Sequence, residues 1–162
     1  MKMRTSHNTV LYKSLTGLKN ARVGVGWFED SKYKNDKNGD IKIGDVAMWQ
    51  EYGTARGIPQ RPFMRPAKMK NYQKWLATAR QQIAQCIEQG KPLTVAMKGL
   101  GLVVKGDIQQ AIRDVMEPPL KPATIANRLR RKKSKEITDT ITKPLIDTGV
   151  MLGAVGAREE EC

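Results

Sequence analysis

Side chains that could perform nucleophilic, acid–base or metal chemistry are scarce in this chain of 162 residues. The only histidine is His7, and the two cysteines, Cys86 and Cys162, lie far apart in the sequence. No catalytic triad built on histidine and no zinc-type ligand set follows from such spacing. Gly24 and Gly26 form a Gly-x-Gly pair, but Phe28 and Glu29 replace the rest of a dinucleotide-binding fingerprint. We therefore expect no enzymatic activity, no cofactor and no metal site.

Positive charge is the strongest chemical signal in the sequence. The formal net charge is +13, and residues 121–143 carry eight Lys or Arg against Glu136 and Asp139. A balance this basic suits an acidic partner, either a protein surface or a nucleic acid backbone. The segment has no aromatic residue on which bases could stack, and a solvated loop is the plain alternative. The residues expected to face a partner or DNA are Arg128, Arg130, Arg131, Lys132, Lys133 and Lys135.

A proline-rich loop near the middle of the chain is the most distinctive motif. It follows a predicted helix over 44–52, and Gly53 suits the end of that helix. Pro59, Pro62 and Pro66 stiffen the loop. Phe63 stands between two arginines, so it either pins the loop to the protein's own core or anchors a partner.

The elements that position these motifs are two long helices and a few separated strands. Alternating residues predict a strand over 21–28, and apolar side chains at helical spacing predict helices over 67–89 and 93–116. The first of these helices is expected to pack on the strand through Tyr72, Leu76, Ala79 and Ile83. Gly99, Gly101 and Gly106 mark either a close crossing or a break in the second helix. Shorter elements are expected at 9–18, 122–131, 150–152 and 154–160, and irregular chain at 132–142.

The inventory predicts an α+β fold, in which a small, mostly antiparallel sheet packs against long helices, with extended loops. We expect one domain over 1–162. The polar stretch 29–42 is expected to be a mobile loop or an extended hairpin tip. The N-terminal residues lack the apolar core of a signal peptide, and no apolar run is long enough to span a membrane.

The proline-rich motif resembles a family of tailed-bacteriophage neck and tail-completion proteins. Members carry an Ala-x-x-x-Glu-Tyr/Phe-Gly-Thr helix end and then Ile-Pro-x-Arg-Pro-Phe. Here Ala47, Glu51, Tyr52, Gly53 and Thr54 match the first part, and 58–63 match the second.

Two later segments resemble the same family. Residues 144–149, Pro-Leu-Ile-Asp-Thr-Gly, match its late motif, and 118–125 resemble the stretch that often precedes it. The family usually has a longer apolar strand after this motif, whereas 153–157 are short of apolar residues. The motif residues taken as structural are Gly53, Pro59, Pro62, Pro144, Asp147, Thr148 and Gly149.

The resemblance implies a structural virion protein at the head–tail junction or the head-proximal end of a tail. Such a subunit would work as a ring, with six copies preferred by analogy with tail symmetry. Its partners would be itself, tail-tube or tail-terminator proteins and head-connector proteins, with a non-specific contact to channel DNA as a further option and no membrane. It would be assembled in the host cytoplasm. Arginine and aromatic side chains are favoured interface anchors, so the expected interface residues are Glu51, Tyr52, Arg56, Arg61, Phe63 and Arg65.

Two other functions remain open on the sequence alone. A basic nucleic-acid-binding module without enzymatic activity rests on the charge, although no known recognition motif is present. A small hydrolase or nuclease has still less support.

Overall fold

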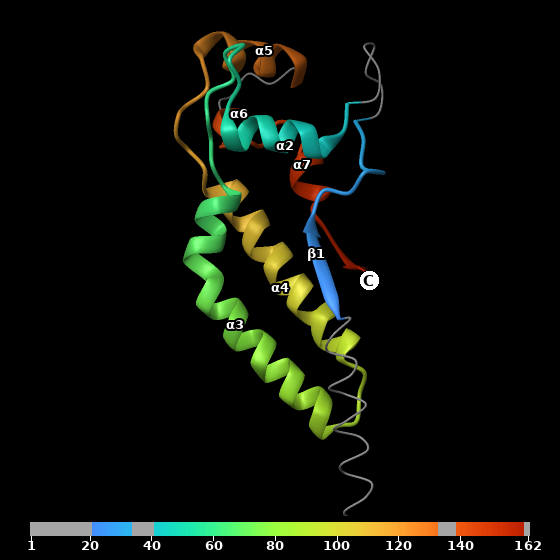
Figure 1. The fold of residues 1–162 in the computed structure, drawn as a ribbon. Coiled ribbons are helices and arrows are strands. Elements are labelled where there is room, and N and C mark those ends of the chain that lie inside the picture. The colour runs from blue at the N-terminus through green and yellow to red at the C-terminus, as the bar shows by residue number, and fades with distance from the viewer. Residues whose placement is uncertain (1–20, 34–40, 133–138, 161–162) are drawn as a thin grey trace, which may run out of the picture. The chain divides into compact units, whose positions relative to one another are not determined.

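The computed structural model describes residues 21–33, 41–132 and 139–160 (Figure 1). Its elements are β1 (Arg22–Gly26), α2 (Ile43–Tyr52), α3 (Met64–Glu88), α4 (Leu93–Asp114), α5 (Pro122–Lys132), α6 (Asp139–Thr142), α7 (Val150–Gly153) and β2 (Gly156–Glu160). Long helices and a small antiparallel sheet confirm the predicted α+β class.

The chain divides into two compact units, each built from segments that are distant in sequence. The first unit holds β1, residues 70–106 and β2, and the second holds Trp27–Met69 and Asp107–Val155. Both long helices contribute residues to each unit.

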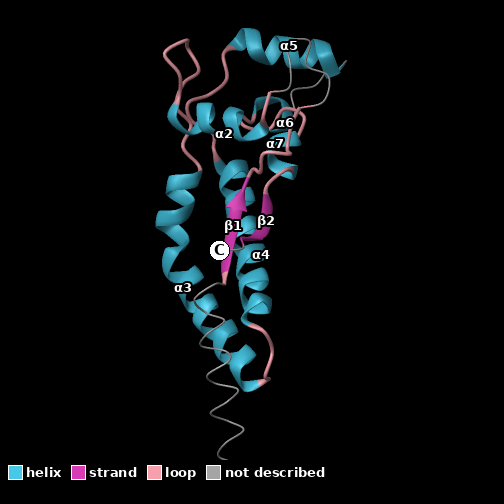
Figure 2. Ribbon diagram, turned by 45° about the vertical axis from the view of Figure 1, so that its right-hand side comes forward, coloured by secondary structure: helices cyan, strands magenta, loops and turns pink. Residues whose placement is uncertain are grey.

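In the first unit, β1 and β2 form a two-stranded antiparallel ribbon that packs on α4 (Figure 2). The register runs from Arg22 opposite Glu160 to Gly26 opposite Gly156. Helix α4 approaches the ribbon at Gly101, where an added Cβ would lie 2.7 Å from Val23 Cγ2. Glycine is therefore required here by the close approach of helix and strand.

The core of the first unit joins α3, α4 and the start of β1. Cys86, Leu93, Ala96 and Met97 are buried, and partly buried apolar residues that include Val23 pack on them. Cys86 thus serves as a small apolar core residue.

The α3 face expected to pack on the strand needs correction. Ile83 joins the cluster that Val23 packs against, but Tyr72 is 51% exposed. The glycines of α4 explain the difference, because they let that helix meet β1 closely at Gly101. Gly99 faces the Gln82 side chain of α3. At both positions the glycines mark crossings, and α4 continues unbroken through them.

In the second unit, the proline-rich loop closes over a core drawn from α2, α4, α6 and α7. Phe63 is 1% exposed and meets Trp27 edge-on at 5.7 Å between ring centroids. Trp27 also donates from Nε1 to the Met151 carbonyl at 2.8 Å. Ile112, Ile141 and other apolar residues complete this core.

Several shorter expectations can be compared with the structure. The final strand forms as β2 despite its few apolar residues, because β1 supplies its hydrogen-bonding partner. Part of the stretch expected to be irregular forms the helix α6. The ends of the 29–42 segment pair as a hairpin, with Lys32 bridged to Lys42. The expected helix at 9–18 and residues 34–40 lie outside the described residues.

Candidate functional site

Glu51 caps the start of α3. Helix α2 stops one residue later because Gly53 adopts a left-handed φ of 74° and turns the chain. The Glu51 carboxylate then accepts hydrogen bonds from the backbone N–H groups of Phe63 (2.7 Å), Met64 (2.9 Å) and Arg65 (3.1 Å). These donors belong to the first turn of a helix, where N–H groups have no partner within the helix. A negative charge at this end of the helix also interacts favourably with the helix dipole.

Arg65, in the first turn of α3, binds Glu51 at the end of α2. Its Nε donates to Glu51 Oε1 at 2.9 Å, and its Nη2 donates to the Glu51 carbonyl at 3.2 Å. The guanidinium lies 4.8 Å from the centre of the Tyr52 ring. Burial raises the pKa of Glu51, but these hydrogen bonds outweigh burial and hold the pKa below its usual value.

Arg61 ties the proline-rich loop to the segment after α4. Its Nε donates to the Pro118 carbonyl at 2.8 Å and its Nη2 to the Pro119 carbonyl at 3.2 Å. Its backbone N–H donates to the Gln50 carbonyl at 2.7 Å. Burial lowers the pKa of Arg61, and the positive charge of Arg128 lowers it further.

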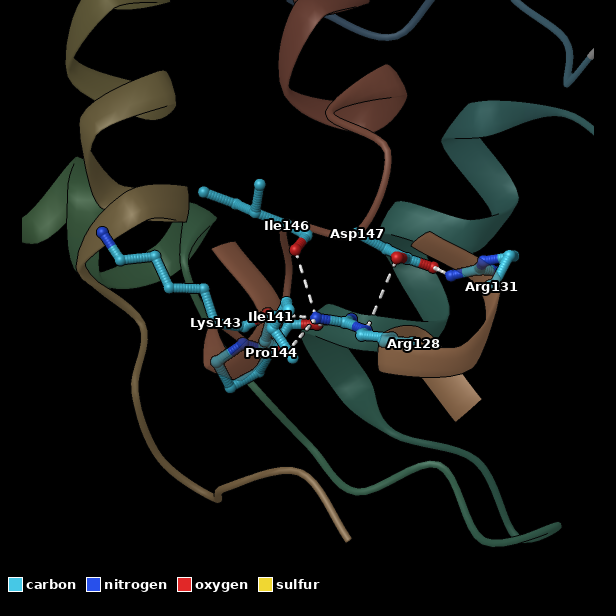
Figure 3. Close-up of polar contacts among 7 residues, drawn as sticks. All are labelled: Arg128, Arg131, Ile141, Lys143, Pro144, Ile146 and Asp147. Carbon is cyan, nitrogen blue, oxygen red and sulfur yellow. Dashed lines mark hydrogen bonds and ion pairs between the residues drawn. The ribbon is translucent and has the colours of Figure 1, made fainter. Parts of the chain in front are cut away.

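Arg128 performs the same task for the late motif (Figure 3). Nη1 donates to the carbonyls of Ile141 (3.1 Å), Lys143 (2.8 Å) and Ile146 (3.1 Å), and Nη2 donates to that of Pro144 (3.2 Å). One guanidinium from α5 therefore organises the backbone of the whole segment 141–146. The planar fork of arginine suits this task better than the point charge of lysine.

Asp147 completes this arrangement on the side facing α5. Its Oδ1 lies 3.6 Å from Arg128 Nε, and its Oδ2 accepts a hydrogen bond from Arg131 Nη2. Burial lowers the pKa of Arg128 and Arg131 adds to this, whereas Asp147 opposes both. Each of the two distinctive sequence motifs is thus built around one buried arginine, Arg61 or Arg128.

Four of the expected partner-facing residues need correction. Glu51 (4% exposed), Arg61 (6%), Phe63 (1%) and Arg128 (6%) are buried within the subunit. Arg61 and Phe63 are predicted at an interface because arginine and aromatic residues favour such places, Arg128 because of its charge, and Glu51 because of the motif. Here backbone groups and the core satisfy them. Of the two interpretations of Phe63, the structure supports the first: this side chain attaches the loop to the protein's own core.

The other expected interface residues are exposed. Tyr52 is 60% exposed, and Arg56 and Arg65 are exposed as well. The structure adds three apolar residues that the sequence reasoning did not select: Met48, Trp49 and Met69. For Met48 and Trp49 the signal is visible in the sequence, because α2 carries apolar residues on both of its faces, whereas Met69 belongs to α3. We call Met48, Trp49, Tyr52, Arg65 and Met69 the α2/α3 face.

The basic residues at the end of α5 are also exposed. Arg130, Arg131 and Lys132 occupy its last turn. Next to them is an open pocket of about 480 Å³, lined by Thr124, Asn127, Arg128, Arg130, Arg131 and Asp147. Lys133 and Lys135 lie outside the described residues.

The remaining motif residues have structural positions. Pro144 is buried and Pro62 is half-buried, whereas Pro59 and Thr148 are exposed. Gly149 has a φ of 76° and precedes α7. An added Cβ at Gly53 would approach the backbone of Ile58 and Gln60 to 3.0 Å, so glycine is needed there for both space and conformation.

Within the described ranges, no three His, Cys, Asp or Glu side chains come together as a metal site. The helices described there include none with the length and apolar character of a membrane span. Comparisons with protein-family models, curated proteins and solved structures found no significant match.

Proposed function

We propose that this protein is a structural subunit of a tailed-phage virion, assembled as a ring at the head–tail junction or the head-proximal end of the tail. One observation carries the proposal. The segments that resemble the neck and tail-completion family are the segments that Glu51, Arg61 and Arg128 hold together in the second unit. These residues therefore fix the shape of the unit, and the proposal assigns recognition to side chains around them.

The α2/α3 face supports assembly with protein partners. Tryptophan, tyrosine, methionine and arginine are enriched at protein interfaces, where tryptophan, tyrosine and arginine contribute most of the binding free energy. Glu51 and Arg65 link the two helices that carry these residues. A face held in this way loses little conformational entropy on docking. The proposed partners are further copies of the chain, six by preference, and the adjoining tail-tube, tail-terminator or head-connector proteins.

A nucleic-acid-binding module is the alternative, and the exposed Arg130, Arg131 and Lys132 favour it. Phosphate neutralisation by such residues makes DNA affinity fall steeply with salt. Titrating the protein with duplex DNA at several salt concentrations distinguishes the two functions. Tight, strongly salt-dependent binding by a monomer favours the alternative.

The direct test is a phage in which the gene for this protein is silenced. The proposal expects full heads and tails that fail to join, or tails of abnormal length, seen by electron microscopy. Supplying the protein from a plasmid should restore joining, and the protein should copurify with virions. Normal, infectious particles made without the protein would contradict the proposal.

A further inference from the structure

We infer that the exposed side of α3 binds the phosphate backbone of duplex DNA through Lys70, Lys74 and Arg80. This inference rests on the proposed function, because DNA has to pass through a ring at the head–tail junction. It is carried by the exposure, the spacing and the composition of this side of the helix.

An exposed stripe runs along the part of α3 that belongs to the first unit. Its members recur at helical spacing and so share one side of the helix. They are Lys70, Gln73, Lys74, Ala77, Arg80, Gln81 and Ala84, and we call them the α3 stripe. Cys86 lies on the opposite side of α3, in the core that this helix shares with α4 (Figure 1).

The α3 stripe is basic because the helix has almost no acidic residues. The cations of α3 are Arg65, Lys68, Lys70, Lys74 and Arg80, and its only carboxylate is that of Glu88, its last residue. Lys70 and Lys74 are four residues apart, a spacing at which like charges destabilise a helix and a Glu–Lys pair stabilises it. The fold therefore gains nothing from placing two lysines there, and an anionic ligand accounts for them.

The composition of the α3 stripe favours DNA over an acidic protein surface. Protein interfaces are depleted in lysine and alanine and enriched in aromatic residues and methionine. The stripe has two lysines and two alanines, and it has no aromatic residue or methionine. Phosphate oxygens are bound by lysine, arginine and glutamine side chains, all of which the stripe contains. The α2/α3 face has the opposite composition, so the two surfaces suit different partners.

The three cations form a row along the helix axis. Lys70 and Arg80 are ten residues apart, which is about 15 Å at a rise of about 1.5 Å per residue. Duplex DNA carries about one negative charge per 1.7 Å of its length, so the row can face several phosphates. All three residues belong to the first unit. One subunit alone should bind DNA weakly, and a ring would repeat the contact around its channel.

Neutralising the row tests the contact. Fluorescence anisotropy of the full chain with a short labelled duplex gives the affinity at several salt concentrations. We expect the wild type to bind with a Kd of about 1–100 µM. K70Q/K74Q/R80Q should bind at least about tenfold more weakly, and its slope of log affinity against log salt should be smaller by about three. K70R/K74R/R80K keeps the charges and should bind like the wild type.

A matched control loses the same charge elsewhere. K121Q/R130Q/K132Q neutralises three exposed cations in or next to α5. It should stay within about threefold of the wild-type affinity, because its cations lie outside the row. Circular dichroism shows whether each variant is folded. If K70Q/K74Q/R80Q unfolds, the three single variants replace it, and each should lower the salt slope by about one.

A selective loss of DNA binding in the α3 variant supports the inference. Equal losses in the two neutralised variants overturn it, because binding then follows net charge alone. It is also overturned if the α3 variant binds like the wild type, or if the wild type does not bind DNA at low salt. An α3 variant that binds DNA normally but fails to restore joining would point to an acidic protein partner instead.

The virion function has its own outcomes. Joining in the silenced phage tests it without reference to DNA affinity in solution. Tight binding by a monomer through Lys70, Lys74 and Arg80 would support this contact and count against the ring.

Discussion

The Glu51 carboxylate accepts a hydrogen bond from the Phe63 backbone N–H at 2.7 Å, although twelve residues separate them. This contact joins the end of α2 to the start of α3. It explains why the Glu-Tyr-Gly-Thr and Pro-x-Arg-Pro-Phe segments occur together: the first supplies the carboxylate, and the second supplies the N–H groups that it binds.

We predict that Glu51→Gln lowers the free energy of unfolding by about 3 kcal/mol, because charged hydrogen bonds contribute more than neutral ones and one amide oxygen replaces two carboxylate oxygens. Urea unfolding measures the loss. Glu29→Gln is the matched control, since that side chain is 94% exposed, and it should unfold like the wild type. Equal stability of both variants would contradict the role of Glu51.

The lowered pKa of Glu51 predicts a pH dependence of stability. In the unfolded chain this carboxylate regains its ordinary pKa, so acid protonates the unfolded form first. The stabilisation is complete above the ordinary value of about 4.3, and it is lost as pH falls through the lower folded value. Urea unfolding from about pH 7 to about pH 3 should show the wild type losing its advantage over Glu51→Gln below that ordinary value. A constant difference across the range would show that Glu51 does not titrate as the structure implies.

Arg128→Lys should cost about 3 kcal/mol, because an ammonium cannot reach four carbonyls and Asp147 together. Thermal unfolding and hydrogen exchange of the 141–149 amides measure the effect, and exchange should accelerate there most. Arg130→Lys, two residues along the same helix and exposed, is the control. Similar melting of the two variants would refute the organising role of Arg128.

Two glycines of α4 should respond to alanine with opposite signs. At Gly101 a Cβ would lie 2.7 Å from Val23 Cγ2 and 3.1 Å from Ala157 Cβ, whereas at Gly106 nothing lies within 4 Å. Gly106→Ala should stabilise by up to about 1 kcal/mol through helix propensity. Gly101→Ala should destabilise by about 1–3 kcal/mol, because overpacking outweighs that gain. Stabilisation by both substitutions would mean that α4 and β1 are not in close contact.

Substitution of the α2/α3 face should impair assembly and spare folding. Met48→Ser and Tyr52→Ser remove side chains that are 55% and 60% exposed, so melting should stay near the wild-type value while plasmid-borne protein no longer restores head–tail joining. Tyr72→Ser is the control, since Tyr72 is a similarly exposed aromatic residue elsewhere. Normal joining by both α2 variants would exclude this face as the interface.

The sequence by itself located the two long helices and the ends of several elements. Apolar spacing located α3 and α4, Gly53 ended α2, and alternation located β1, because these signals depend on neighbours along the chain. It also identified the proline-rich loop and the Asp147-Thr148-Gly149 segment as distinctive.

Only the tertiary structure decided which arginines are buried. Arg61 and Arg56 belong to one loop, and Arg128 and Arg130 to one helix, and local sequence does not separate them. The difference arises from carbonyls elsewhere in the chain: those of Pro118 and Pro119 surround Arg61, and those of 141–146 surround Arg128. Burying a guanidinium is favourable only where such acceptors replace water. Whether they converge depends on the fold, so the division between structural and exposed cations appears only when distant segments are brought together.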